Sequence, residues 1–286
     1  MSSSSIRKLG ISAAACLLAV AAVAPAAAQK MKAEEVIAKH LESVGPAAAR
    51  AAVKNRVALG TVVITFREPA GQLSGVAVLS SQGEKSLIGM SFDNPSYPHE
   101  KVGFDGKDVS VSFVRPGRRS TFGDFLMQHR SIIKQGLVGG TLSDAWPLFR
   151  AAEEKAKIEY SGLKKVGDRQ AHALKYLPRG GSDMNVILFF DAETFRHVRT
   201  EYTRTLAAQM GATPEASARQ RESRYKLVED FTDFRPENGL TLPHKYRVTL
   251  EMMLPGGSYK LEMDMDFQQF AFNQDIDPNS FDVDGE

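Results

Sequence analysis

Two long stretches near the C-terminus alternate strictly between apolar and polar residues. In Lys245–Met252, and again in Tyr259–Phe267, every second side chain is apolar and the side chains between them are charged or polar. A period of two over this length indicates β-strands with one dry and one wet face. The intervening Leu-Pro-Gly-Gly-Ser sequence predicts a hairpin connection. The dry face comprises Tyr246, Val248, Leu250, Met252, Tyr259, Leu261, Met263, Met265 and Phe267.

The first 28 residues have the features of a cleaved signal peptide. Arg7 and Lys8 form a basic start, Leu9–Val23 is apolar but short for a membrane span, and Ala26-Ala27-Ala28 resembles a cleavage site. An uncleaved membrane anchor is the alternative interpretation. We expect cleavage after Ala28, a periplasmic location, and one domain formed by residues 29–286.

Composition narrows the function of the exported part. The only cysteine, Cys16, lies in the predicted leader, which leaves no residue for a disulfide or for thiol chemistry. The chain has 36 basic and 34 acidic residues, and the leader contains two of the basic ones and no acidic one. A balanced charge and export both argue against a nucleic-acid-binding protein.

The pattern predicts a helix, a run of strands, a helical middle and a second run of strands. The first helix is expected at Ala33–Val44, where apolar residues recur at helical spacing before Gly45-Pro46. Leu206–Glu222 is expected to be a long hairpin loop. Strands are expected at Val57–Arg67, Leu73–Ser80, Glu84–Met90, Lys101–Phe104, Lys107–Val114, from Lys157 onward, and at Ala171–Leu177, Met184–Phe190, Phe195–Thr205, Tyr225–Phe234 and Leu240–Met253.

The helical middle is the candidate cover for the dry face. Thr121 and Asp124 have capping-box spacing ahead of an apolar stripe, and Thr141–Glu154 is expected to be a second helical region with the only tryptophan. Gly136 and Gly139-Gly140 give this region backbone freedom for a hinge. We expect it to act as a lid, with permanent core as the alternative, and with these side chains facing inward: Phe125, Leu126, Ile133, Trp146 and Phe149.

Motifs for catalysis and metal binding are missing from the sequence. It contains no G-x-S-x-G, H-E-x-x-H, P-loop or G-x-G-x-x-G, and none of its six histidines stands at metal-ligand spacing from another. Asp275, Asp277, Asn279 and Glu286 have the spacing of a calcium loop, but Ser280 occupies the position that needs glycine. We therefore expect no catalytic residues, no metal and no cofactor.

The order of elements resembles the LolA/LolB-like superfamily, and in particular the bacterial outer membrane lipoprotein-sorting proteins. The resemblance implies an α+β domain in which a curved antiparallel sheet of about ten to twelve strands forms an incomplete β-barrel capped by helices. LolA itself holds its lid with an arginine, and the sequence alone does not single out an equivalent. The stretches that carry the resemblance are Ala33–Leu41, Phe104–Lys107, Phe190–Phe195, Thr241–His244 and Asn273–Phe281.

The resemblance implies a non-enzymatic carrier of lipid or lipoprotein acyl chains. An apolar barrel cavity would hold the chains, and methionine suits a cavity that adapts to irregular guests. Its partners would be those acyl chains and, transiently, the membrane or envelope proteins, with the chain itself a monomer. The alternatives are an envelope interaction or sensor module without a ligand, and a hydrolase with an unrecognised site. Besides the lid residues, the expected ligand contacts are Val248, Leu250, Met252, Leu261, Met263 and Met265.

Overall fold

The computed structural model describes residues 31–286 apart from 68–69, 152–155, 179, 209–220 and 285–286. The predicted signal peptide, its cleavage after Ala28 and most of the predicted loop Leu206–Glu222 lie outside the described residues. Within the described part, no helix combines the length and apolarity that a membrane span requires.

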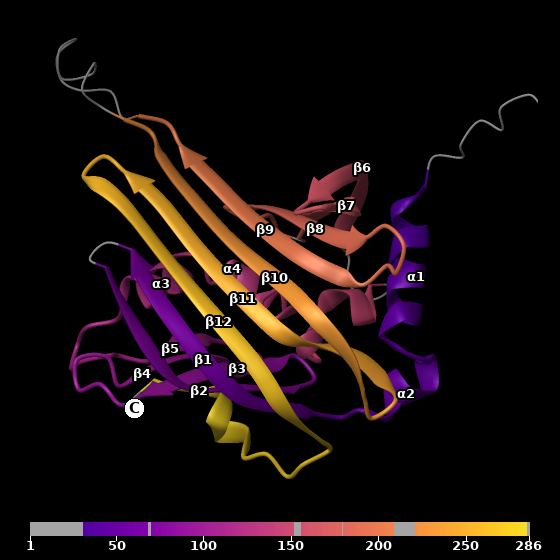
Figure 1. Cartoon of the computed structure of the whole chain (residues 1–286), viewed down its shortest axis with the longest axis horizontal. Helices are drawn as coiled ribbons and strands as arrows, with labels where there is room; N and C mark the ends of the chain where they lie inside the picture. The colour runs from indigo at the N-terminus through magenta and orange to yellow at the C-terminus, as the bar shows by residue number, and fades with distance from the viewer. Residues whose placement is uncertain (1–30, 68–69, 152–155, 179, 209–220, 285–286) are drawn as a thin grey trace, which may run out of the picture. The chain divides into compact units, whose positions relative to one another are not determined.

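In the part of the chain that the structure describes, twelve antiparallel strands form one sheet (Figure 1). From edge to edge the order is β5-β4-β3-β2-β1-β12-β11-β10-β9-β8-β7-β6, so the first and last long strands are neighbours in its middle. Among the described residues the edge strands β5 and β6 do not pair, which confirms the predicted incomplete barrel. The strands are β1 (Arg56–Arg67), β2 (Ala70–Gln82), β3 (Lys85–Phe92), β4 (His99–Phe104), β5 (Val109–Val111), β6 (Lys157–Val166), β7 (Arg169–Leu177), β8 (Asn185–Asp191), β9 (His197–Leu206), β10 (Ser223–Glu237), β11 (Leu240–Leu254) and β12 (Gly257–Phe272).

The predicted hairpin of alternating strands is confirmed as β11 and β12. Val248 pairs with Met263 and Leu250 with Leu261, and all four side chains are buried. Arg247 pairs with Asp264 on the opposite face, where the two side chains form an exposed ion pair. The alternation in sequence therefore does separate a buried apolar face from a solvated charged one.

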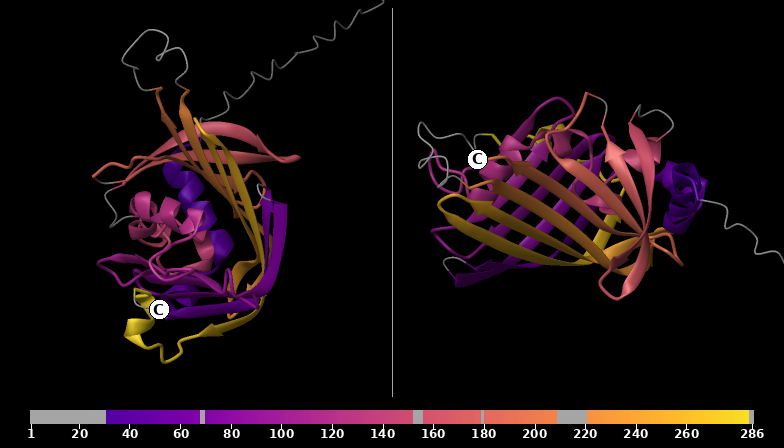
Figure 2. Two further views of the ribbon diagram at one scale, coloured as in Figure 1. Left: turned by 90° about the vertical axis from the view of Figure 1, so that its left-hand side faces the viewer. Right: turned by 90° about the horizontal axis from the view of Figure 1, so that it is seen from above.

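The helices are short, and two of them, α3 and α4, lie at the concave face of the sheet. Figure 2 shows α3 and α4 within the curve that the strands make. The apolar core lies between them and the inward side chains of the strands, including Ile64, Leu79 and Leu250. The helices are α1 (Ala33–Val44), α2 (Ala47–Ala52), α3 (Thr121–Gln128) and α4 (Ser131–Lys134), with the 3-10 turns η1 (Gly140–Leu142), η2 (Pro147–Arg150) and η3 (Pro278–Phe281).

Two local predictions are wrong. Over the described residues 141–151, the helical region expected at Thr141–Glu154 forms the short 3-10 turns η1 and η2 and not one helix, because Pro147 holds the preceding Trp146 in an extended conformation. The strand expected at Lys107–Val114 contracts to β5, because the Asp105 carboxylate accepts the backbone N–H groups of Lys107 and Asp108 in a turn.

Candidate functional site

Residues 121–150, here called the central segment, cover the concave face of the sheet. Its first helix, α3, begins at Ser120, whose hydroxyl accepts the Gly123 N–H at 2.8 Å, so the N-cap is this serine and not the predicted Thr121. Phe122, Phe125 and Leu126 are the large apolar side chains that α3 buries. The helix thus turns its apolar face toward the strands, as its apolar spacing predicts.

A turn at Gly136 lets the central segment double back. Gly136 has φ of 65°, and a Cβ atom there would lie 1.9 Å from the Ala145 carbonyl oxygen. Only glycine combines that conformation with so close an approach. Gly136, which the sequence predicts to be part of a hinge, therefore allows two parts of the central segment to pack directly against each other.

The predicted ligand-contacting residues are nearly all buried in one core. Leu126, Val248, Met263 and Met265 line a common cavity of about 20 Å³. That volume is close to the space of a single water molecule, so the interior is packed shut in this conformation. Phe149 is only half-buried. Phe125, Ile133, Trp146, Leu250, Met252 and Leu261 are buried in the same core but do not line this cavity.

Trp146 docks the central segment onto two buried histidines. Its indole N–H donates to His40 Nε2 of α1 at 3.2 Å, and its ring stacks on His197 of β9 with centroids 4.5 Å apart. Burial lowers the pKa of His40 to about 4 and that of His197 well below its ordinary value. Neutral His40 accepts at Nε2, so its Nδ1 carries the proton that is donated to the Phe195 carbonyl at 3.1 Å.

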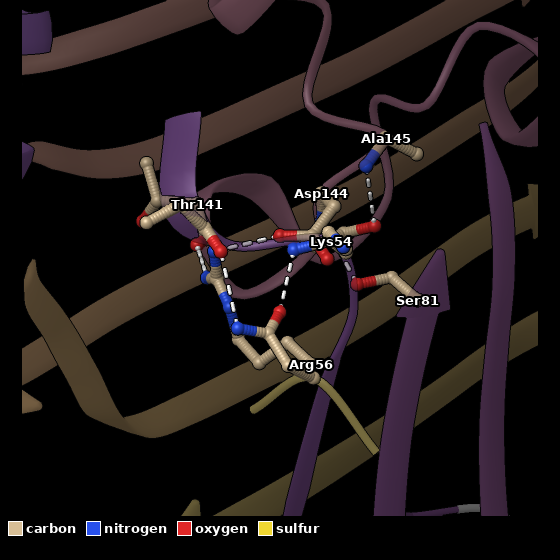
Figure 3. A network of polar contacts seen from close by, with 9 residues as sticks. Lys54, Arg56, Ser81, Thr141, Asp144 and Ala145 are labelled. Atoms are coloured by element: carbon tan, nitrogen blue, oxygen red, sulfur yellow. Dashed lines mark hydrogen bonds and ion pairs between the residues drawn. The ribbon is translucent and has the colours of Figure 1, made fainter. Parts of the chain in front are cut away.

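A buried arginine joins β1 to the central segment (Figure 3). Arg56 donates to the Thr141 carbonyl at 2.6 Å and to Asp144 Oδ1 at 2.8 Å, and the Asp144 N–H donates to Ser81 Oγ of β2 at 2.9 Å. Burial lowers the pKa of Arg56 and raises that of Asp144, while their ion pair opposes both shifts. Both strands therefore hold the same turn of the central segment.

A buried glutamate provides a second polar attachment. Glu229 of β10 is fully buried and accepts the Gly139 N–H at 2.8 Å, the Tyr202 hydroxyl at 2.6 Å and the Tyr246 hydroxyl. Burial raises its pKa to about 7. Glu229 also lines the small cavity beside Met263 and Met265. It is thus a polar group in an otherwise apolar interior.

A third buried carboxyl group lies at the start of α3. Glu100 of β4 is buried and accepts the Tyr97 hydroxyl, and burial raises its pKa to about 7. A Cβ atom on Gly123 would lie 3.1 Å from Glu100 Oε1, so the carboxyl group reaches the first turn of the helix. The positive end of the helix dipole favours a carboxylate at that position.

Sequence reasoning missed Arg56, Glu100 and Glu229. For Glu229 a signal was present, because it stands in phase with Leu227 and Phe231 on the inward face of β10. A charged residue at an inward position of an apolar strand marks a buried polar contact. Its partner, Gly139, lies 90 residues away in the chain, and no local pattern connects the two.

The large hollows outside the core lie on the outer face of the sheet and have mixed polar and apolar linings. A groove of about 850 Å³ on the wet face of β9–β12 is lined by charged residues that pair with one another, such as Arg199 with Asp230 at 2.6 Å. Across the described residues, no group of three metal-ligating side chains is positioned to bind an ion. The apolar interior beneath the central segment is therefore the candidate site.

Comparison with known proteins finds similarity at the level of structure. No protein-family model matches the chain, and no curated protein matches it. It is similar to a LolA superfamily protein from Nitrosomonas europaea, with 14% identity, a TM-score of 0.48, and coverage of 88% of this chain and 97% of that chain. A domain described as outer membrane lipoprotein-sorting, from Vibrio parahaemolyticus, has 10% identity and a TM-score of 0.44, with 87% and 96% coverage.

MucB from Pseudomonas aeruginosa, solved in complex with MucA, is a more distant similarity. It has 10% identity and a TM-score of 0.22, with coverage of 84% of this chain and 100% of that chain. All three similarities concern the fold, and no residue role is transferred from them.

Proposed function

We propose that this chain is an exported periplasmic carrier, not an enzyme, that holds the acyl chains of a lipid or lipoprotein between its sheet and its central segment. The observation that carries the proposal is the way this segment is held. It covers an apolar sheet face with apolar side chains, yet its position is set by a few polar attachments, chiefly those of Arg56 and Glu229. An acyl chain can replace apolar contacts without needing their shape.

The energetics of such an exchange favour a long apolar guest. Each CH₂ group removed from water contributes about 0.8 kcal/mol, so a chain of about twelve groups gains roughly 10 kcal/mol. Opening opposes this gain, because the apolar side chains of α3 and α4 leave the sheet and the buried polar contacts are lost. Binding affinity is the difference between the two, which allows both loading and release.

The guest would lie along the inward faces of β11 and β12. Val248, Leu250 and Met252 would contact it from β11, and Leu261, Met263 and Met265 from β12. From the central segment, Phe125, Leu126 and Ile133 would cover it. Trp146 and Phe149 would move with the segment, and Trp146 would report the movement because it is the only tryptophan.

One observation favours a second function. The interior cavity has a volume of only about 20 Å³, as expected for a protein whose core is permanently packed. If the core is permanently packed, the chain is an envelope interaction or sensor module that binds partners through its surface and carries no ligand.

Native mass spectrometry of protein purified from its own periplasm, followed by lipid extraction, separates the two functions. The carrier should retain lipid, and added lipid should change Trp146 fluorescence. Hydrogen exchange should be faster in residues 121–150 than in β11 and β12. Lipid-free protein with unchanged fluorescence, and with exchange in the central segment as slow as in the strands, would establish the interaction module instead.

A further inference from the structure

Among the described residues that line the small interior cavity, Glu229 is the one acidic side chain. The cavity that it shares with Met263 and Met265 is otherwise formed by apolar side chains and Tyr246. Glu229 Oε1 accepts the Gly139 N–H of the central segment at 2.8 Å and also the Tyr246 hydroxyl, while Oε2 accepts the Tyr202 hydroxyl at 2.6 Å. Two of these three donors belong to the sheet and one belongs to the segment that must withdraw.

Withdrawal of the central segment changes the hydrogen bonding of Glu229 in one respect. Tyr202 on β9 and Tyr246 on β11 stay beside the carboxyl group, because their strands pair directly with β10. The Gly139 N–H leaves, so Oε1 loses a donor and faces the space into which an acyl chain would enter. A buried acceptor that loses a donor raises the free energy of the open protein. A ligand that supplies a donor at that position therefore binds more tightly.

We infer that Glu229, oriented by Tyr202 and Tyr246, recognises the polar end of the ligand and selects an acylated amine, whose amide N–H takes the position of the Gly139 N–H. This inference rests on the carrier function proposed above and specifies the substrate class of the same site. The central segment then acts as an internal ligand that satisfies Glu229 while the interior is empty.

The surroundings of Glu229 favour an amide over an anionic or an ester head group. The donor that it binds in the closed state is itself a peptide N–H, so an amide reproduces both the geometry and the neutral charge. A carboxylate or phosphate head group would bring its negative charge into an apolar site beside an acidic side chain. An ester of the same length has no N–H and would leave Oε1 without its second donor.

A matched pair of ligands tests the inference without any mutation. N-methylhexadecanamide has one N–H, whereas N,N-dimethylhexadecanamide has none and carries one more methyl group. Displacement of the apolar dye N-phenylnaphthylamine from the wild-type protein measures both. The N–H compound should bind roughly 10- to 100-fold more tightly, although apolar burial alone favours the dimethyl compound. Methyl hexadecanoate should bind like the dimethyl amide.

Variants identify the acceptor. The triple variant Tyr202→Phe, Glu229→Met, Tyr246→Phe replaces the buried polar side chains by apolar ones of similar size. It leaves neither tyrosine hydroxyl unsatisfied, and only the Gly139 N–H loses its acceptor in the closed state. It should bind both amides within about twofold of each other. Asp230→Asn, next in sequence but on the wet face beside Arg199, is the matched control and should keep the wild-type ratio.

The outcomes separate this inference from the function on which it rests. Equal binding of both amides by the wild-type protein rejects the role of Glu229 and leaves the carrier function standing. If the triple variant still prefers the N–H compound, the role of Glu229 is also rejected, because another group must then accept the amide N–H. If neither amide nor the ester displaces the dye, the carrier function fails and the inference fails with it.

Discussion

The β11–β12 hairpin and the central segment meet across the same interior but are held in opposite ways. The inward face of the hairpin is apolar along its length, from Tyr259 to Phe267 and from Tyr246 to Met252, and its position is fixed by strand pairing. The central segment consists of short helices joined by turns, and two buried polar side chains of the sheet, Arg56 and Glu229, hold it by hydrogen bonds. Apolar contact is non-directional and can be remade with a guest, whereas the polar contacts define a single closed position.

The largest loss of stability and of lipid binding should come from placing a charge on the inward, apolar face of the β11–β12 hairpin. Met263→Asp puts a carboxyl group at a position that is 1% exposed, where it should destabilise the fold by about 3–5 kcal/mol and abolish lipid binding. Asp264→Leu, one residue away on the wet face, removes only an exposed ion pair with Arg247 and should change stability by about 1 kcal/mol or less.

Circular dichroism melting and lipid binding check this pair of variants together. A Met263→Asp protein that folds and still retains its native lipid would place the ligand outside the β11–β12 face. An Asp264→Leu protein as unstable as Met263→Asp would show that the two faces do not differ as proposed.

The next largest loss of stability should come from replacing Arg56, one of the polar side chains that hold the central segment. Arg56→Met leaves the Asp144 carboxylate buried without its cation, at a penalty of about 3 kcal/mol that falls on the closed state. The double variant Arg56→Met, Asp144→Leu removes both charges and should regain most of the loss. Hydrogen exchange should locate the difference in residues 121–150 and leave β11 and β12 protected.

Global unfolding of Arg56→Met, with strands and central segment exchanging at one common rate, would contradict a separate closed state. Failure of the double variant to recover would show that Arg56 stabilises the protein by its contact with the Thr141 carbonyl, not by its ion pair.

The two regions also differ in how far the sequence predicts them. The alternation in Lys245–Phe267 predicts which side chains of the hairpin are buried, because a strand with one dry face needs only its own residues to reveal it. The central segment was predicted less well, since left-handed Gly139 and Gly140 and the bend at Pro147 interrupt the helical pattern. The attachments were missed because Arg56 and Glu229 bind backbone groups 85 and 90 residues away.

The free energy of unfolding should depend on pH through His40 and Glu229, and the two groups should contribute slopes of opposite sign. His40 has a folded pKa lowered to about 4 by burial, so its contribution is complete above its ordinary pKa of 6.5 and is lost as the pH falls toward 4. Glu229 has a folded pKa raised to about 7, so its contribution is complete below its ordinary pKa of 4.5 and is lost as the pH rises toward 7. In the wild-type protein the two trends oppose each other between these limits.

Removing either group should remove its own trend from the difference between variant and wild type. Relative to the wild type, His40→Gln should lose stability as the pH rises from 4 to 6.5, and Glu229→Gln as it falls from 7 to 4.5, each by about 2–3 kcal/mol. Urea unfolding at several pH values measures both slopes. Parallel slopes in the two variants would contradict the assigned burial of His40 or of Glu229.

The smallest predicted change in stability distinguishes a buried serine that hydrogen-bonds to the central segment from one that is only buried. Ser81→Ala removes the acceptor of the Asp144 N–H and should weaken closure by about 1 kcal/mol, which corresponds to roughly fivefold faster hydrogen exchange in the central segment. Its neighbour Ser80 is also buried, yet among the described residues its hydroxyl has no hydrogen-bond partner, so Ser80→Ala should leave exchange unchanged or slow it slightly. The two variants remove the same atom from adjacent positions of β2. If they accelerate exchange equally, the central segment is held by packing alone and its polar contacts do not set the closed position.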